Sequence, residues 1–242
     1  MTLPDNPVFV ALDTPDVAQA LDVAGAVRGA VGGVKVGLEF FNAQGPQGVA
    51  RIVDLDLPVF LDLKYHDIPN TVAGAVRQAA RLGLTLLNVH AAGGMAMLRG
   101  ARDAAQEGAD AAGVAAPLVI GVTVLTSLDE DDLADTGQTG PVDAQVVRLA
   151  RLTQAAGCHG VVASPREIAR LRQACGPDFK LVVPGIRPAS AAKGDQKRTM
   201  TPAEAVALGA DALVIGRPIT GAADPAVAAA AIAAEVAAAR VA

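Results

Sequence analysis

Short apolar runs rich in β-branched residues recur along this 242-residue chain, and segments of helical character separate them. The runs cover residues 7–13, 34–40, 59–64, 85–90, 118–125, 160–164, 180–186 and 212–217. Strands that are apolar on both faces are typical of parallel sheets covered by helices. Eight such units in a chain of this length predict a closed (β/α)8 barrel, a TIM barrel of the α/β class, rather than an open sheet. We expect residues 1–242 to form this barrel as a single domain.

Two short motifs support this order of strands and helices. Residues 164–167 (Ser-Pro-Arg-Glu) and 201–204 (Thr-Pro-Ala-Glu) each combine a capping residue, a proline and a glutamate three residues after the cap. This combination is typical of the first turn of a helix. The composition agrees, since 52% of the residues are hydrophobic and only 2% are aromatic, which suits small-residue helices packed on buried strands.

The overall charge and the two cysteines limit the function. A formal net charge of -5 gives no basic surface for a nucleic acid backbone, so an anionic ligand would need a local cluster of Lys and Arg. The Ala-rich segment 226–234 is too short to cross a bilayer, and the first residues do not resemble a secretion signal. Cys158 and Cys175 have neither metal-site nor CxxC spacing, so we expect reduced structural residues in a cytoplasmic protein.

The third apolar run carries charge at its end. Asp62 and Lys64 are two residues apart, so on a regular strand their side chains point to the same face. Leu61 and Leu63 are apolar, which makes the charged face the barrel interior. Charge inside a barrel is unfavourable unless it is paired. One interpretation is an ion pair that only closes the mouth of the barrel. The other is an active site, which in this fold lies at the carboxyl ends of the strands.

Two more charged residues belong to the same end of the predicted barrel. Lys35 ends the second strand and Asp13 ends the first. Either alone could be a solvated residue at a strand end. Together with the third strand they place four charges on three adjacent strand ends, which favours a functional cluster. Asp67 follows three residues after Lys64, where the strand has become a loop, and could reach a different pocket.

The ten residues from Asp62 to Thr71 (Asp-Leu-Lys-Tyr-His-Asp-Ile-Pro-Asn-Thr) resemble the signature of the orotidine 5'-monophosphate decarboxylase family. Further blocks resemble that family in the same order, at residues 11–13, 35–37, 125–127, 183–188 and 215–218. The resemblance covers the whole chain, although the Asp-x-Lys-x-x-Asp core also occurs in phosphosugar decarboxylases and aldolase-like synthases. It implies removal of carbon dioxide from C6 of orotidine 5'-monophosphate, which leaves UMP, as a step in pyrimidine biosynthesis.

The resemblance also implies roles for the charged residues. We expect Lys64 to donate the proton to the ring carbon and Asp62 to face the departing carboxylate, with Lys35 and Lys64 on either side of Asp62. Asp67 and Thr71 resemble residues that the family donates across a homodimer to the neighbouring site.

The same comparison argues against a bound metal. By this resemblance, relatives that bind a metal have a Glu at the position where this sequence has Lys35. The sequence has no GxGxxG motif opening a helix, no P-loop and no CxxC pair. We therefore assign no metal and no cofactor.

Phosphate sites in this fold commonly use the loops after the seventh and eighth strands. Arg187 lies in the first loop, and Gly216 and Arg217 lie in the second. Arginine suits bidentate phosphate contact, and glycine lets backbone N–H groups approach an anion. A surface salt bridge is the alternative for each arginine. Residues 189–198 have the composition of a mobile solvated loop, and by resemblance they are a lid in which Gln196 contacts the phosphate.

Three polar residues follow other strands. By resemblance, Thr126 and Ser127 contact the pyrimidine and ribose of the substrate. Ser127 could instead cap a helix, with Glu130 three residues later. His90 ends the fourth strand and is expected to have a structural role.

Two other functions remain open at this stage. One is a magnesium-dependent decarboxylase of a 3-keto sugar phosphate on the same barrel, and Lys35 argues against it. The other is an inactive barrel that binds a phosphate ligand, and the intact pair Asp62 and Lys64 argues against it.

Overall fold

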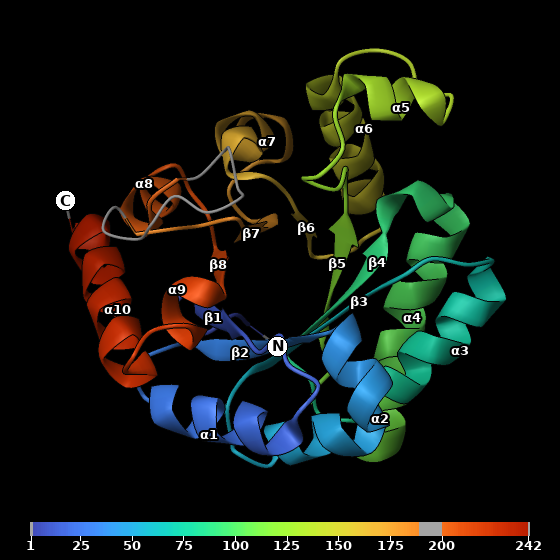
Figure 1. The fold of residues 1–242 in the computed structure, drawn as a ribbon. Coiled ribbons are helices and arrows are strands. Elements are labelled where there is room, and N and C mark those ends of the chain that lie inside the picture. Colours follow the sequence, from blue (N-terminus) through green and yellow to red (C-terminus); the bar gives the residue numbers. More distant parts are fainter. Residues whose placement is uncertain (1, 189–199, 242) are drawn as a thin grey trace.

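Eight parallel strands form a closed barrel in chain order, and helices surround it (Figure 1). The computed structural model describes residues 2–188 and 200–241. The strands are β1 Val8–Ala11, β2 Gly33–Gly37, β3 Val59–Tyr65, β4 Leu86–His90, β5 Leu118–Val122, β6 Gly160–Val162, β7 Lys180–Pro184 and β8 Ala212–Ile215. The last strand pairs with the first in the register Phe9 to Val214, which closes the sheet. The predicted (β/α)8 barrel is confirmed.

Helices follow the strands as the caps predict. They are α1 Val17–Val27, α2 Leu38–Val53, α3 Pro69–Ala80, α4 Gly94–Ala112, α5 Glu130–Asp135, α6 Val142–Ala155, α7 Ile168–Cys175, α8 Pro202–Ala207, α9 Arg217–Thr220 and α10 Pro225–Val241. Ser164 and Thr201 both form the expected capping boxes, with Glu167 and Glu204. In the described part of the chain, no helix combines the length and the apolar character needed to cross a membrane.

Several strands are shorter than the apolar runs that predict them. The run 34–40 leaves the sheet at Gly37, and Leu38 already begins helix α2. The run 118–125 likewise leaves β5 at Val122. Phe40 is fully buried as a helical residue, so the same apolar run serves a strand and then the first turn of a helix. Apolar character alone does not separate these two uses.

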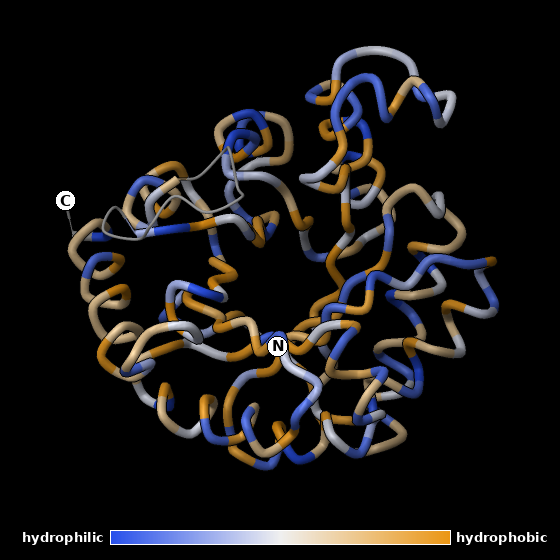
Figure 2. Tube along the Cα trace, viewed as in Figure 1, coloured by the Kyte–Doolittle hydropathy of each residue, from blue (hydrophilic) through white to orange (hydrophobic). Residues whose placement is uncertain are grey.

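The core has two layers, which the alternation along each strand separates. On β3, Val59 and Leu61 pack with helix residues in the outer layer, whereas Phe60 belongs to the small cluster inside the barrel. That inner cluster contains Phe9, Phe60, Leu86, Leu118, Ile120, Val182 and Ala212. Figure 2 shows the apolar strands inside a ring of helices that alternate between apolar and polar residues. Asp62 continues the inner row of β3 beyond Phe60, so the interior changes from apolar to charged toward the carboxyl ends.

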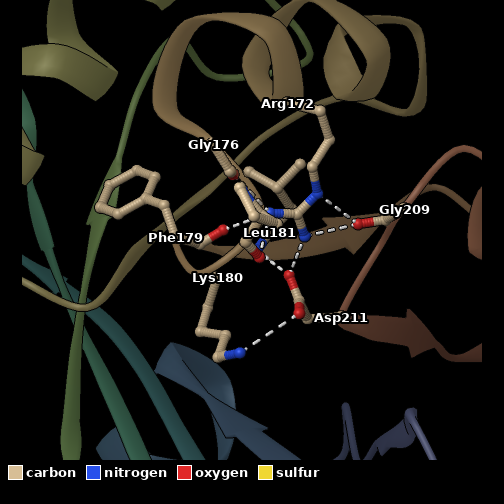
Figure 3. A network of polar contacts seen from close by, with 8 residues as sticks. Arg172, Gly176, Phe179, Lys180, Leu181, Gly209 and Asp211 are labelled. Carbon is tan, nitrogen blue, oxygen red and sulfur yellow. Dashed lines mark hydrogen bonds and ion pairs between the residues drawn. The ribbon is translucent and has the colours of Figure 1, made fainter.

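A network of hydrogen bonds and ion pairs joins elements at the amino-terminal end of the barrel, opposite to the charged strand ends (Figure 3). Arg172 of α7 donates to the carbonyl of Gly209 and to that of Phe179 at 2.6 Å, and it forms an ion pair with Asp211. Asp211 also accepts the N–H of Leu181 at 2.8 Å. One guanidinium thus joins α7 to the starts of β7 and β8. In this fold, residues at the amino-terminal end of the barrel typically contribute to stability rather than to catalysis.

Neither cysteine forms a disulfide with the other. Cys158 is buried and Cys175 is half-buried, and both are free thiols. Burial raises the pKa of the Cys158 thiol to about 12. A thiol in this state is a poor nucleophile, in agreement with the expected structural role.

Candidate active site

Four charged side chains form a continuous array at the carboxyl ends of the first three strands. Lys35 Nζ lies 2.6 Å from Asp13 Oδ1 and 3.8 Å from Asp62 Oδ2. Lys64 Nζ lies 2.6 Å from Asp62 Oδ1. The charges therefore alternate in the order Asp13, Lys35, Asp62, Lys64, as two acids and two bases. We call these four residues the charged array.

The array lies partly inside the barrel. The side chains of Lys35 and Asp62 are 10% and 16% exposed, whereas that of Asp13 is 60% exposed. Lys35 is in the middle of β2 rather than at its end, and its long side chain extends toward the mouth. Asp13 lies two residues after the end of β1. The prediction that the two strands end at these residues was therefore wrong in detail, but the four charges do meet.

The pairing offsets the unfavourable burial of these charges. A buried ammonium or carboxylate is tolerated when an opposite charge and hydrogen bonds replace its water. Within the described residues, every buried side-chain nitrogen and oxygen has a hydrogen-bond partner. The array is therefore held in place before any ligand binds, which is the arrangement that electrostatic catalysis needs.

Regular strand alternation does not by itself explain the contact between Asp62 and Lys64. The pairing of β3 with β4 runs from Leu61–Leu87 to Tyr65–Val89, so three residues of β3 face a single residue of β4. Lys64 has φ of 51°, in the left-handed region. Bulges of this kind redirect side chains and are frequent beside active sites. The prediction of a shared inward face was correct in outcome, but the backbone reaches it through a bulge.

The residue opposite this bulge is Asn88, which the sequence analysis did not single out. Its side chain is fully buried. Its Oδ1 accepts the N–H of Lys64 at 2.8 Å, and its Nδ2 donates to Asp62 Oδ1 at 2.7 Å. A polar residue at an inward position of an apolar strand was the available signal, since Leu86 two residues earlier faces the inner cluster.

Asp67 and Thr71 are not brought to the array within one chain. Asp67 is exposed, and its Oδ1 accepts the N–H of Ile68 at 2.6 Å. Among the described residues it forms no ion pair with either lysine of the array. Thr71 is exposed in the first turn of α3. Ile68 between them is a large apolar side chain that is 67% exposed.

The loops after β7 and β8 carry the predicted phosphate residues. Arg187 is half-buried, and its backbone N–H donates to the carbonyl of Met200 at 3.0 Å. Gly216 lies against the end of β1, where an added Cβ would be 3.5 Å from Ala11 Cβ. Arg217 is exposed at the start of α9. Gln196 lies outside the described residues, as do the other residues of 189–199.

The loop after β5 gives one correction. Thr126 and Ser127 are exposed in a turn. The cap of α5 is Asp129, whose side chain accepts the N–H groups of Asp131 and Asp132. The interpretation of Ser127 as a helix cap was therefore wrong, and the interpretation as a substrate contact stays a prediction.

His90 lies at the mouth beside the array. Its ring centroid is 5.3 Å from that of His66. Burial lowers the pKa of His90, and the neighbouring His66 and Lys64 lower it further, against an opposing effect of Asp62. These effects favour the neutral imidazole, and the structural role expected of His90 stays a prediction.

The sequence matches the family model described as the orotidine 5'-phosphate decarboxylase / HUMPS family over residues 6–232. The chain belongs to this family. Orotidine 5'-phosphate decarboxylases from Paramagnetospirillum magneticum and Rhodospirillum rubrum are similar to it, with 55% and 58% identity over 96% of this chain and 98% and 94% of theirs. The crystal structure of orotidine 5'-phosphate decarboxylase from Lactobacillus acidophilus matches with a TM-score of 0.86 and 39% identity, covering 96% of this chain and 99% of that one.

The family description joins two names, and the relatives reported above carry only the first. The family assignment confirms the resemblance seen in the residues from Asp62 to Thr71. In this family member, the charged array lies at the carboxyl-terminal end of the barrel, which is where enzymes of this fold have their active sites.

Proposed function

We propose that this protein decarboxylates orotidine 5'-phosphate to UMP, a step of pyrimidine biosynthesis, without a metal or another cofactor. The observation that carries the proposal is the charged array, in which two ammonium groups flank the inward carboxylate of Asp62. Loss of carbon dioxide from C6 leaves an electron pair on that carbon. A site with fixed positive charge at the carbon can stabilise this pair without an organic electron sink.

Lys64 is the proposed proton donor. Its side chain is 29% exposed at the mouth of the barrel, so a bound pyrimidine could contact it. The bond from C6 to the carboxylate breaks, its electrons stay on C6, and one N–H proton of Lys64 forms the new C6–H bond. The neutral amine then regains a proton from water, which returns the site to its starting state.

Asp62 and Lys35 are proposed to set the field around the reacting carbon. Asp62 would face the carboxylate that leaves, and this repulsion is relieved as carbon dioxide departs. Lys35 lies between Asp13 and Asp62, with its Nζ 2.6 Å from Asp13 Oδ1 and 3.8 Å from Asp62 Oδ2, so its positive charge offsets the repulsion between the two carboxylates. Because the protein fixes these groups before the reaction, little reorganisation is needed in the transition state.

Phosphate recognition is proposed at the loops after β7 and β8, of which the second lies beside the Asp13 end of the charged array. Arg187, Gly216 and Arg217 belong to the loops after β7 and β8, where this fold commonly binds phosphate. Gln196 would add a contact, and Thr126 and Ser127 would contact the pyrimidine and ribose. Binding energy from a phosphate remote from C6 can stabilise the transition state by closing the site and excluding water.

A homodimer with shared sites is proposed to complete the substrate pocket. Asp67 and Thr71 are both exposed, and the Asp67 carboxylate accepts the N–H of Ile68. Two large apolar side chains near this region are exposed. Leu38, at the start of α2, is 53% exposed, and Ile68, after the end of β3, is 67% exposed. A two-fold dimer would bury such residues and exchange Asp67 and Thr71 reciprocally. The two free thiols favour the cytoplasm as the place of action.

The absorbance of orotidine 5'-phosphate during conversion to UMP tests this function directly. We expect turnover that dialysis against EDTA leaves unchanged, because Lys35 Nζ already occupies the position between Asp13 and Asp62 where a cation would bind two carboxylates. Activity lost with EDTA and restored by magnesium would instead favour the decarboxylase of a 3-keto sugar phosphate. Substrate binding without turnover would favour the inactive binding barrel.

A further inference from the structure

Asn88 is a polar residue in the middle of an apolar strand. Leu87 and Val89 on either side of it pack in the outer core layer, so the Asn88 side chain points into the barrel. It is fully buried, one step above Leu86 of the inner cluster. A buried amide is destabilising unless its donors and acceptor are paired. The partners of Asn88 therefore indicate why a polar residue is present there.

The first partner is the backbone of Lys64. Three residues of β3 face Asn88, so the regular ladder between β3 and β4 is interrupted at this point. Lys64 also has φ of 51°, a backbone conformation that is unfavourable for a residue with a side chain. The Asn88 carbonyl accepts the Lys64 N–H at 2.8 Å, in place of a strand partner. This bond stabilises the backbone conformation from which the Lys64 side chain extends.

The second partner is the carboxylate of Asp62. Asn88 Nδ2 lies 2.7 Å from Asp62 Oδ1, and Lys64 Nζ lies 2.6 Å from the same oxygen. Two donors on one oxygen fix the orientation of the carboxylate. The other oxygen, Oδ2, then faces Lys35 at 3.8 Å. One side chain thus holds both the backbone of Lys64 and the orientation of Asp62.

We infer, on the basis of the proposed function, that Asn88 is a positioning residue for the reaction. It touches neither the substrate nor the reacting carbon in this account and acts through Lys64 and Asp62. A site in which the proton donor lies in a strained backbone conformation needs such a support, because small displacements of the donor strongly reduce the rate. Substrate affinity depends mainly on other groups and is largely independent of Asn88.

Three variants test this role. Asn88→Ala removes both hydrogen bonds. Asn88→Asp has nearly the same shape and keeps an acceptor for the Lys64 N–H, but it places a carboxylate against Asp62. Leu87→Val is the matched control, since Leu87 is the neighbouring buried residue of β4 and faces the opposite side of the sheet. It perturbs packing of the strand without touching the charged array.

Steady-state kinetics with orotidine 5'-phosphate give the first readout. We expect Asn88→Ala to lower kcat by about 100-fold, a loss typical of a displaced reacting group, and to change KM by less than about threefold. Leu87→Val should keep kcat within about twofold of the wild type. Asn88→Asp should also lose kcat, and it replaces Asn88→Ala if the latter does not fold. A kcat near that of the wild type, or a KM that rises as much as kcat falls, would overturn the role.

Amide hydrogen exchange at Lys64 gives a second readout that needs no substrate. The Lys64 N–H should be protected in the wild type and in Leu87→Val and should exchange at least about tenfold faster in Asn88→Ala. Equal exchange in all three proteins would overturn the positioning role even if the enzyme is active. If the wild type does not convert orotidine 5'-phosphate but exchange follows this pattern, the proposed function fails while the structural effect of Asn88 stands.

Discussion

The Lys35 ammonium donates to Asp13 Oδ1 at 2.6 Å, and this ion pair joins β2 to the segment after β1 at the mouth of the barrel. Lys35 is nearly buried, whereas Asp13 is largely exposed. The second carboxylate near Lys35, that of Asp62, is farther away at 3.8 Å and holds Lys64 more closely. The array is thus two close ion pairs in loose contact, and removal of one lysine leaves a carboxylate without its nearest partner.

The first prediction concerns Lys64. Lys64→Ala should lower kcat by about a thousandfold or more, because it removes both the proton donor and the positive charge at the reacting carbon. Binding of UMP, measured by calorimetry, should remain largely intact because the phosphate and ribose contacts are elsewhere. Lys180→Ala, at the amino-terminal end of the barrel, is the control and should retain turnover. Near-normal turnover in purified Lys64→Ala would exclude Lys64 as the donor.

Arg217 should act on the phosphate alone. Arg217→Ala is expected to weaken kcat/KM for orotidine 5'-phosphate by about 1.5–3 kcal/mol, or roughly 10- to 150-fold. The loss for orotidine without its phosphate should be small, since only the phosphate can use the guanidinium. Arg28→Ala, which removes an exposed arginine beside Asp56, controls for a general change of charge. Equal losses on both substrates would give Arg217 a structural role.

Arg172 should be needed for stability but not for chemistry. Its guanidinium binds the carbonyls of Gly209 and Phe179 and pairs with Asp211, all at the end of the barrel opposite to the array. Arg172→Met should lower the free energy of unfolding by about 3 kcal/mol, because Asp211 then loses its closest partner. Arg170 lies on the same helix as Arg172, and Arg170→Met breaks only an exposed ion pair with Asp143 of α6, so it should change the free energy of unfolding by less than about 1 kcal/mol. Urea unfolding of both variants, together with kcat at a temperature where they are folded, checks this.

Acid should destabilise the fold partly through His90. Burial and the neighbouring His66 and Lys64 lower the pKa of His90 below 6.5, so the unfolded chain binds this proton at a higher pH than the folded chain does. The stabilising contribution is complete above about pH 6.5. It is lost as the pH falls from there toward the lowered pKa. Urea unfolding between pH 7.5 and 5 should show a smaller loss of stability in His90→Gln than in the wild type. The same slope in both proteins would contradict this assignment.

The periodic features of the chain made the fold predictable. Each apolar run fell on a strand, because parallel strands buried on both faces leave a strong signal in the sequence. The capping boxes at Ser164 and Thr201 were predictable for a similar reason, since all their interacting residues lie within four positions. The ends of the strands were less predictable, as Phe40 shows, because an apolar residue fits a strand or a first helical turn equally well.

The site residues that carry charge could be predicted from the sequence, whereas those whose position depends on strand pairing could not. Asp62 and Lys64 stood out because charge is rare on the inner face of a strand. The bulge that faces Asn88 and the φ of 51° at Lys64 depend on the pairing between β3 and β4, which no single segment encodes. The contacts of Arg172 likewise join residues up to 39 positions apart, mostly through backbone carbonyls that have no sequence signature.

The last prediction concerns the shared active site. Asp67 lies beyond the end of β3, and within its own chain its carboxylate accepts the Ile68 N–H rather than approaching the array. If the partner subunit supplies Asp67, a heterodimer of Lys64→Ala and Asp67→Ala has one site with both lesions and one intact site. Random exchange makes half of the dimers mixed, so activity should recover to about a quarter of that of the wild type.

A mixture of Lys64→Ala and Lys35→Ala is the matched control for this exchange. Both lysines belong to the charged array of one chain, so each site of the mixed dimer carries one lesion and activity should not return. Subunit exchange is verified independently, with one variant carrying an affinity tag. Recovery in the first mixture and none in the second requires a site built from two chains, because no arrangement within one chain distinguishes the two pairs of lesions. With exchange verified, equal inactivity of both mixtures would mean that Asp67 acts within its own chain, after a movement of the loop that carries Ile68.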